Sequence, residues 1–261
     1  MIKIVYVLSR RDEIAPNAFY EYWLGSHGPR VRGHAKAIRA RKYVQSHLID
    51  TPANRGMQEA RGMMEPAAGI TEVWWDSIAD LEAAFRDPAG VAATQDLADD
   101  EAKFVDIGRC QLFVTQEHTI FDYTAGAKLG ADAVKVTYLL SKPDKLTVAE
   151  CHRTWLNDHG PLVTSFAKTM RAAKYIQSHT ITPDFNANLV ATRGFAKPLD
   201  GITEVWWAST DEMQAGSATP EGQRVGSALV EDERRFVEMS RSRCFLTKEH
   251  VIFDYTKTAI V

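Results

Sequence analysis

Hydrophobic and polar positions follow one another in the same order twice along this chain. Residues 3–9 alternate between apolar and polar side chains, which predicts a strand, and residues 135–141 do the same. Apolar residues at helical spacing come next in each half, and the pattern Thr147-x-x-Glu150 predicts the start of a helix. Further strands are predicted over 41–49, 69–76 and 110–118 and over 173–181, 201–208 and 242–250, with helices between them. Each half therefore has the order βαββαβ, the ferredoxin-like split-βαβ arrangement.

The two halves repeat in sequence as well as in pattern. The segment KYVQSH over 42–47 returns as KYIQSH over 174–179, an offset of 132 residues, and GITEVWW over 69–75 returns unchanged over 201–207. A period this long is a whole domain rather than a solenoid unit. We predict two domains, residues 1–123 and 135–261, joined by a linker over 124–134. A residue kept in both copies is a better candidate for fold or site than one kept in a single copy.

The order of elements predicts an α+β fold. In a single copy, helices cover one face of a four-stranded antiparallel sheet, and the other face needs a cover. The second copy supplies it, so we expect two ferredoxin-like repeats packed sheet to sheet as a pseudo-symmetric eight-stranded barrel. Three local features are expected as well. His-Gly-Pro at 27–29 and 159–161 breaks a helix, the divergent stretch over 50–68 forms a surface loop, and a tail ending in Phe-Asp-Tyr closes each copy.

Each half resembles the EthD family of the dimeric alpha/beta-barrel superfamily. The resemblance rests on Trp23-x-x-x-His27-Gly28-Pro29 with its copy at 155–161, on the strand over 43–47, and on the tail over 117–123. It covers nearly the whole chain, once per half. It implies a fused dimeric alpha/beta barrel, and it leaves the reaction open because the superfamily includes oxygenases, cyclases, decarboxylases and isomerases.

Composition narrows the class of protein. The chain has 261 residues, 45% hydrophobic and 25% charged, with a net charge of -3, as in an ordinary globular protein. This charge gives no reason to expect nucleic acid or an anionic membrane as a partner, and no apolar run is long enough for a membrane span. The opening strand has no signal-peptide pattern, so the expected location is cytoplasmic. None of the three cysteines is repeated, which disfavours a disulfide framework or zinc cluster. Whether the fused pair dimerises further is left open.

Repeated histidines are the candidates for acid and base. His27 and His159 precede Gly-Pro, where the positive end of the next helix would favour a neutral ring that accepts a proton. His47 and His179 lie on the second strand of each copy and are the partner candidates. The alternatives are that the first pair seals a turn and that the second belongs to a hydrogen-bond network between the halves.

Neighbouring repeated side chains are the candidates for substrate binding. Period two places Tyr43 and Gln45 on the face of His47, where they could hold an oxyanion. The adjacent tryptophans of the third strand point to opposite faces, and one of them could form the wall of an aromatic pocket. The full set of substrate-binding candidates is Tyr43, Tyr175, Gln45, Gln177, Trp74, Trp75, Trp206, Trp207, Glu72 and Glu204.

Two further pairs of carboxylates, Asp100-Glu101 and Asp232-Glu233, lie on the apolar side of a helix in each half. Their simplest role is pairing with the repeated Arg109 and Arg241 or with water, although either carboxylate could also act with a nearby histidine.

The chain lacks the Gly-rich and Gly-x-Ser-x-Gly motifs of nucleotide binding and serine hydrolysis, and a metal would need two histidines and a carboxylate to converge. We therefore expect no cofactor and no metal. We predict an enzyme using histidine acid/base chemistry on a small hydrophobic carbonyl compound, aromatic or polyketide-like, as a lyase, isomerase or cyclase. The alternatives are a cofactor-free monooxygenase of a phenolic substrate and a non-catalytic module that binds a hydrophobic ligand.

Overall fold

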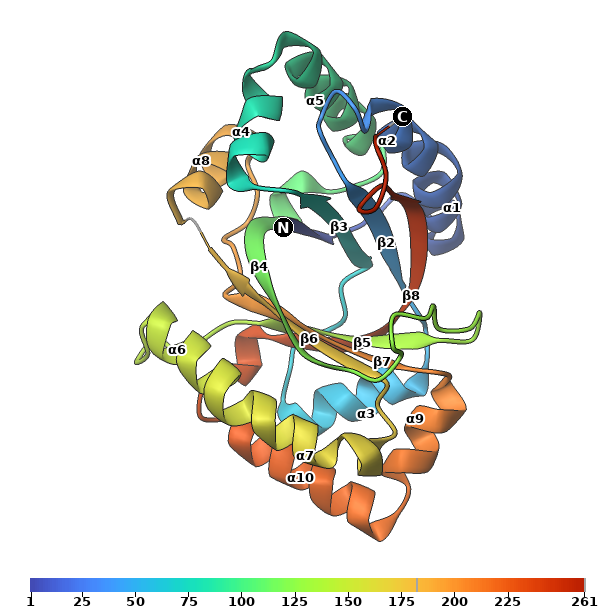
Figure 1. Cartoon of the computed structure of the whole chain (residues 1–261), viewed down its shortest axis with the longest axis vertical. Coiled ribbons are helices and arrows are strands. Elements are labelled where there is room, and N and C mark those ends of the chain that lie inside the picture. The colour runs from blue at the N-terminus through green and yellow to red at the C-terminus, as the bar shows by residue number, and fades with distance from the viewer. Residues whose placement is uncertain (182, 261) are drawn as a thin grey trace.

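The two halves fold alike and together form one closed barrel. The computed structural model describes residues 1–181 and 183–260. The strands of the first half are β1 Ile2–Leu8, β2 Lys42–Leu48, β3 Gly69–Trp75 and β4 Gln111–Asp122; those of the second are β5 Val134–Leu140, β6 Lys174–Thr180, β7 Gly201–Trp207 and β8 Arg243–Asp254. They close in the order β1-β3-β2-β8-β5-β7-β6-β4 with antiparallel neighbours (Figure 1). The predicted α+β barrel of two fused repeats is confirmed.

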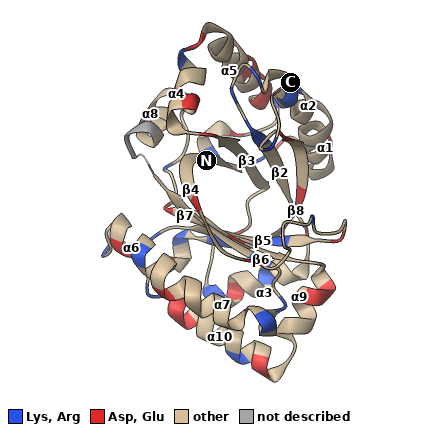
Figure 2. Ribbon diagram, viewed as in Figure 1, with Lys and Arg blue, Asp and Glu red and all other residues tan. Residues whose placement is uncertain are grey.

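Helices cover the outside of the barrel in two groups, each made of helices from one half together with one helix from the other half (Figure 1). The α-helices of the first half are α1 Pro16–Tyr22, α2 Gly28–His34, α3 Pro52–Arg61, α4 Ile78–Arg86 and α5 Pro88–Glu101; those of the second are α6 Val148–Thr154, α7 Gly160–Met170, α8 Pro183–Arg193, α9 Thr210–Ser217 and α10 Pro220–Glu233. Residues of both charge signs are spread over the helices outside the barrel (Figure 2). No helix in the described part of the chain has the length and apolar content needed to cross a membrane.

The long strands β4 and β8 join the halves. β4 pairs with β1 of its own half over Gln111–Gln116, and its later residues pair with β6 of the other half. β8 does the same with β5 and then β2. The Phe-Asp-Tyr segment was expected to close its own copy. Its Phe121 lies opposite Tyr175 of the second half, so it closes the barrel between copies instead.

The prediction of a surface loop after the second strand of each half is wrong, because this stretch contains a helix in both halves. Thr51 caps the start of α3, and Gly62 ends it with a φ of 70°, a left-handed conformation that suits glycine. The helix packs on β8 of the other half, where the buried Asn54 side chain accepts a hydrogen bond from the Leu246 amide (2.8 Å). In the same way α8 reaches back to β4. Each half therefore sends one helix onto the sheet of the other.

The predicted helix break at His-Gly-Pro is also wrong. The chain stays helical through a five-residue π-turn, Trp23–His27, and its copy Trp155–His159. The Gly28 amide donates to the Trp23 carbonyl, five residues back, which widens the turn just before Pro29. The extra residue of a π-turn changes which side chains face the sheet, and such turns often occur at functional sites. Here the turn ends on the repeated histidine.

Candidate functional site

A cavity lies between the outer face of the sheet and the helices in each half, and the two differ in size. The second-half cavity has a volume of about 410 Å³, and the first-half cavity about 120 Å³. Only the larger falls within the roughly 300–1,000 Å³ of typical ligand sites. The polar side chains in its wall are Arg61, Tyr138, His159, Tyr175, Thr203, Gln214, Ser217 and Glu233.

Each cavity is lined by a histidine that is bonded to an aspartate. Nδ1 of His159 lies 2.8 Å from Oδ2 of Asp232 on α10, and Nδ1 of His27 lies 2.9 Å from Oδ2 of Asp100 on α5. A carboxylate accepts a hydrogen bond from the ring N–H, so it fixes the tautomer with the proton on Nδ1. Among the described residues, none forms a hydrogen bond with Nε2 of either ring. A neutral ring held in this way presents Nε2 as a proton acceptor.

The aspartates do not pair with the arginines expected from the sequence. Arg109 bonds Asp106 and Asp12 instead, because its side chain extends over the exposed turn before β4. Burial raises the pKa of Asp100, but hydrogen bonds from Tyr22, His27 and Lys103 outweigh burial and lower it to about 2.

The corresponding expectation in the second half is also wrong. Arg241 bonds Asp144 on the surface, and Asp232 bonds His159 and Arg235. These bonds, with that from His159 the strongest, lower the pKa of Asp232. Both aspartates are thus ionised partners of a histidine. The helix continues through the histidine, so the helix-end effect that the sequence suggested is absent, and the aspartate orients the ring instead.

His47 and His179 do not line either cavity. Each ring stacks on a tryptophan of the π-turn, with centroids 4.4 Å apart, and its Nε2 lies 3.0 Å from the side-chain oxygen of Gln45 or Gln177. Burial, together with neighbouring histidines, lowers the pKa of His47 to about 3 and that of His179 to about 2. Both rings are therefore neutral near pH 7 and packed within a hydrogen-bond network.

The glutamines of this network face the π-turn. Gln177 Nε2 donates to the Trp155 carbonyl (2.9 Å) and to the Tyr175 hydroxyl (2.8 Å), and Gln45 does the same with Trp23 and Tyr43. The tyrosines line the two cavities, whereas the glutamines do not. Of this predicted group, only the tyrosines are therefore in position to meet a ligand.

The paired tryptophans point to opposite faces, as expected. Trp75 and Trp207 line the cavities, with their indole N–H bonded to backbone carbonyls (2.7 Å). Trp74 and Trp206 face the barrel interior, where a lysine ammonium lies 5.3 Å from each ring. The inner pair is therefore separated from the cavities by the sheet.

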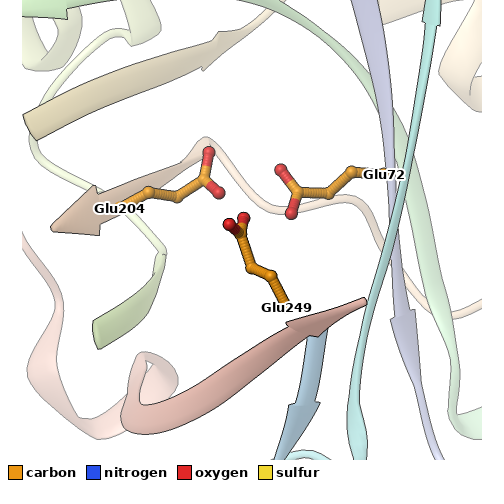
Figure 3. Close-up of side chains that lie close together, drawn as sticks. All are labelled: Glu72, Glu204 and Glu249. Atoms are coloured by element: carbon orange, nitrogen blue, oxygen red, sulfur yellow. The ribbon is translucent and has the colours of Figure 1, made fainter. Parts of the chain in front are cut away.

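Glu72 and Glu204 also face the barrel interior, so the sheet separates them from the cavities. They form a buried charge cluster with Glu249 (Figure 3), Lys3 and Lys135. Each ammonium lies 2.6–2.9 Å from both central carboxylates. Burial and the charge of Glu72 raise the pKa of Glu204 to about 7, while Lys135 and Lys3 outweigh burial and lower the pKa of Glu72. This cluster is a shared ionic core between the halves.

His27, His47 and Glu72, the set considered for a metal, lie in three different environments: a cavity, a stacked network and the barrel interior. Among the described residues, the carboxylates of Glu72, Glu204 and Glu249 come close enough to share an ion, and lysine ammonium groups lie between them.

Bulkier side chains account for the smaller first-half cavity. At equivalent positions Phe85 stands where the second half has Ser217, and Thr94 stands where it has Gly226. Leu112 likewise replaces Cys244. Each exchange places more atoms in the first-half wall.

Two repeated positions of the cavity wall are not among the candidates that the sequence suggests. Tyr6 and Tyr138 lie in the alternating strands over 3–9 and 135–141, where the pattern indicates only a strand. Arg193 and Arg61 come from the helices that were predicted as loops, and each lines the cavity of the opposite half. The retained Arg-Gly at 61–62 and 193–194 inside a divergent stretch was the available clue.

Comparison with known proteins gives a family and a fold. The EthD domain model matches residues 11–108 and 143–240. No curated protein matches the sequence.

Solved structures with similar folds include an anthrone oxidase-like protein, with a TM-score of 0.58 and 11% identity over 97% of this chain and 94% of that chain. Another is a putative monooxygenase from Fusobacterium nucleatum subsp. nucleatum ATCC 25586, with a TM-score of 0.52 and 6% identity over 97% of this chain and 92% of that chain. At these identities the likeness is one of fold.

Proposed function

The chain belongs to the EthD family in both of its halves, and on that premise we propose that it is an enzyme that removes a proton from a small hydrophobic substrate in the second-half cavity. The observation that carries this proposal is the His159–Asp232 pair, which lines a cavity of about 410 Å³. A neutral imidazole oriented by a carboxylate is a common general base.

The wall of the cavity supports a hydrophobic substrate. Trp207, Phe236 and Val205 contribute apolar surface, and apolar residues make up most of the lining. A pocket of this kind suits a flat aromatic or polyketide-like molecule. Such a molecule can have an acidic hydrogen next to a carbonyl or on a phenol, and either is a target for His159.

Two fates of the resulting anion remain as candidates. Reprotonation or elimination gives isomerase or lyase chemistry, which needs acid and base groups only. Reaction of the anion with oxygen gives a cofactor-free monooxygenase, and the names of the anthrone oxidase-like and putative monooxygenase structures favour this second candidate. Both candidates begin with the same proton removal.

Deuterium incorporation tests the shared first step. We would incubate the protein with 2-tetralone, an aromatic ketone with acidic C–H bonds, in D₂O and follow exchange by mass spectrometry. His159→Gln is expected to lower the catalysed exchange by about 10²–10⁴-fold, the usual contribution of a general base. His27→Gln, the same change in the smaller cavity, is the matched control and is expected to retain exchange within about threefold of the wild type. Exchange that survives in His159→Gln would refute the proposal.

Oxygen uptake separates the two fates. With anthrone as the substrate, oxygen consumption that depends on His159 supports the monooxygenase, and exchange of 2-tetralone without oxygen consumption supports the isomerase or lyase. Tight binding of both compounds without any turnover would instead favour a binding module.

A further inference from the structure

Tyr138 presents a buried hydroxyl with no strong acceptor in the wall of the second-half cavity. The side chain is 6% exposed, and its hydroxyl lies 3.4 Å from the sulfur of Met239, a weak acceptor. The equivalent hydroxyl of Tyr6 is buried without a partner among the described residues. Folded proteins rarely leave such a group unsatisfied, and a waiting ligand is one explanation.

Arg61 lies beside this hydroxyl and comes from the other half of the molecule. Its guanidinium carbon is 6.0 Å from the centroid of the Tyr138 ring. Nε and Nη2 donate to the carboxylate of Glu233 (2.8 and 3.1 Å). The cavity wall therefore combines a hydroxyl that meets only a weak acceptor with the positive charge of a neighbouring guanidinium.

We propose that Tyr138 and Arg61 form an oxyanion site that binds the substrate oxygen on which negative charge develops when His159 removes a proton. The inference rests on the proposed function and specifies its substrate class as hydrophobic phenols and enolisable ketones. With a phenol, the O–H bond breaks, the proton moves to Nε2 of His159 and the electron pair stays on the oxygen. With a ketone, the C–H bond breaks, the proton moves to Nε2 of His159, the C–H electron pair forms a carbon–carbon double bond, and the π pair of the carbonyl moves to its oxygen.

The neighbouring charge supports Tyr138 over Tyr175, the other tyrosine hydroxyl of the wall. Burial raises the pKa of both tyrosines, so both hydroxyls keep their protons and can donate to an anion. The Tyr175 hydroxyl is held by the Gln177 amide, whereas Tyr138 lies beside the Arg61 guanidinium, whose positive charge favours an oxyanion. In the first half the ring of Phe195 packs edge-on against Tyr6 at 5.3 Å, next to the smaller cavity. Because Tyr6 is the equivalent tyrosine in the cavity of about 120 Å³, which is smaller than typical ligand sites, it serves as a matched control.

The test is the acidity of a bound phenol. 4-Nitrophenol changes its absorption on ionisation, so a pH titration at saturating protein gives the pKa of the bound probe. Wild-type protein is expected to lower this pKa below that of free 4-nitrophenol. Tyr138→Phe removes a charge-assisted hydrogen bond and is expected to raise the bound pKa by about one unit or more relative to the wild type. Tyr6→Phe is expected to leave it unchanged.

A second variant keeps the test informative if Tyr138→Phe is poorly folded. Arg61→Gln combined with Glu233→Gln removes the arginine without leaving a buried carboxylate unpaired, and the bound pKa is again expected to rise. Thermal melting checks the fold of each variant.

The outcomes separate the two proposals. A bound pKa that stays at the wild-type value in both folded variants, or that shifts equally in Tyr6→Phe, would overturn the oxyanion site while leaving proton removal by His159 intact. Failure of the wild type to bind 4-nitrophenol would count against the proposed function itself.

Discussion

The two cavities share a fold and a histidine–aspartate pair, yet their volumes are about 410 and 120 Å³. The conserved part comprises the groups that would perform chemistry, and the variable part comprises the side chains that decide whether a substrate fits. Phe85 against Ser217 and Thr94 against Gly226 are the clearest exchanges. Duplication can thus keep one copy as a binding site while the other supplies a structural partner and one helix for the shared wall.

Substitutions of the charged residues in the barrel interior are expected to have the largest effect on stability. Equivalent substitutions in the two halves are expected to have the same effect, because both halves contribute the same residues to this cluster. Lys3→Met and Lys135→Met each remove one of the two ammonium groups that balance the charge of the buried carboxylates, which costs about 3–5 kcal/mol. Urea unfolding is expected to give the same loss in free energy of unfolding for both variants. A difference of more than about 1 kcal/mol between them would show that the asymmetry extends beyond the cavities.

Exchanging the bulky and small wall residues between the halves is expected to exchange the ability of the two cavities to bind a ligand. Ser217→Phe with Gly226→Thr is expected to weaken 4-nitrophenol binding at least about tenfold, because the added atoms occupy the space of the ligand. A Cβ at Gly226 would have no atom within 4 Å, so the backbone tolerates the change. Calorimetry measures the affinity.

The reverse exchange is the matched experiment. Phe85→Ser with Thr94→Gly is expected to open the first-half cavity and raise the number of sites per chain from one to two. If Ser217→Phe with Gly226→Thr leaves the affinity for 4-nitrophenol unchanged, the bulk of the wall side chains is not the cause of the difference in cavity volume. The same holds if Phe85→Ser with Thr94→Gly leaves the number of sites per chain at one.

The stacked histidines predict a smaller effect that depends on pH. The folded-state pKa values of His47 and His179, about 3 and about 2, lie below the roughly 6.5 of an unfolded chain. Above that value both states are neutral and stability is insensitive to these groups. As pH falls below it, the unfolded state binds protons that the folded state excludes, so stability is lost by up to about 1.4 kcal/mol per pH unit for each ring.

The comparison between halves sharpens this prediction. His179 has two histidine neighbours, His118 and His152, whereas the histidine nearest His47 is His250. His179→Gln is therefore expected to flatten the slope between pH 6.5 and 5 at least as much as His47→Gln, as measured by urea unfolding at each pH. If the free energy of unfolding falls with pH equally steeply in the wild type and in both variants, the lowered pKa values of His47 and His179 are contradicted.

The barrel could be predicted from the sequence because the repeat is long and its motifs are nearly unchanged between the halves. The 132-residue offset identified two equal units, and the period-two pattern identified both faces of each strand. It also separated Trp74 from Trp75 correctly. The prediction of EthD domains in both halves is confirmed by the family match.

The parts that sequence could not supply depend on contacts between the halves. Pairing of β4 with β6 and packing of α3 on β8 join residues that no local pattern connects. The position of Arg61 in the opposite cavity follows from that packing. Cavity volume depends on the sum of many wall side chains, so Ser217 and Gly226 carried no signal of their own.

The most direct test of the account is a crystal structure of the chain with bound 2-tetralone. We predict the ketone in the second-half cavity, with its oxygen at hydrogen-bond distance from the Tyr138 hydroxyl and its acidic carbon about 3–3.5 Å from Nε2 of His159. A ketone bound in the first-half cavity, or one in the second-half cavity held away from His159, would contradict the central claim.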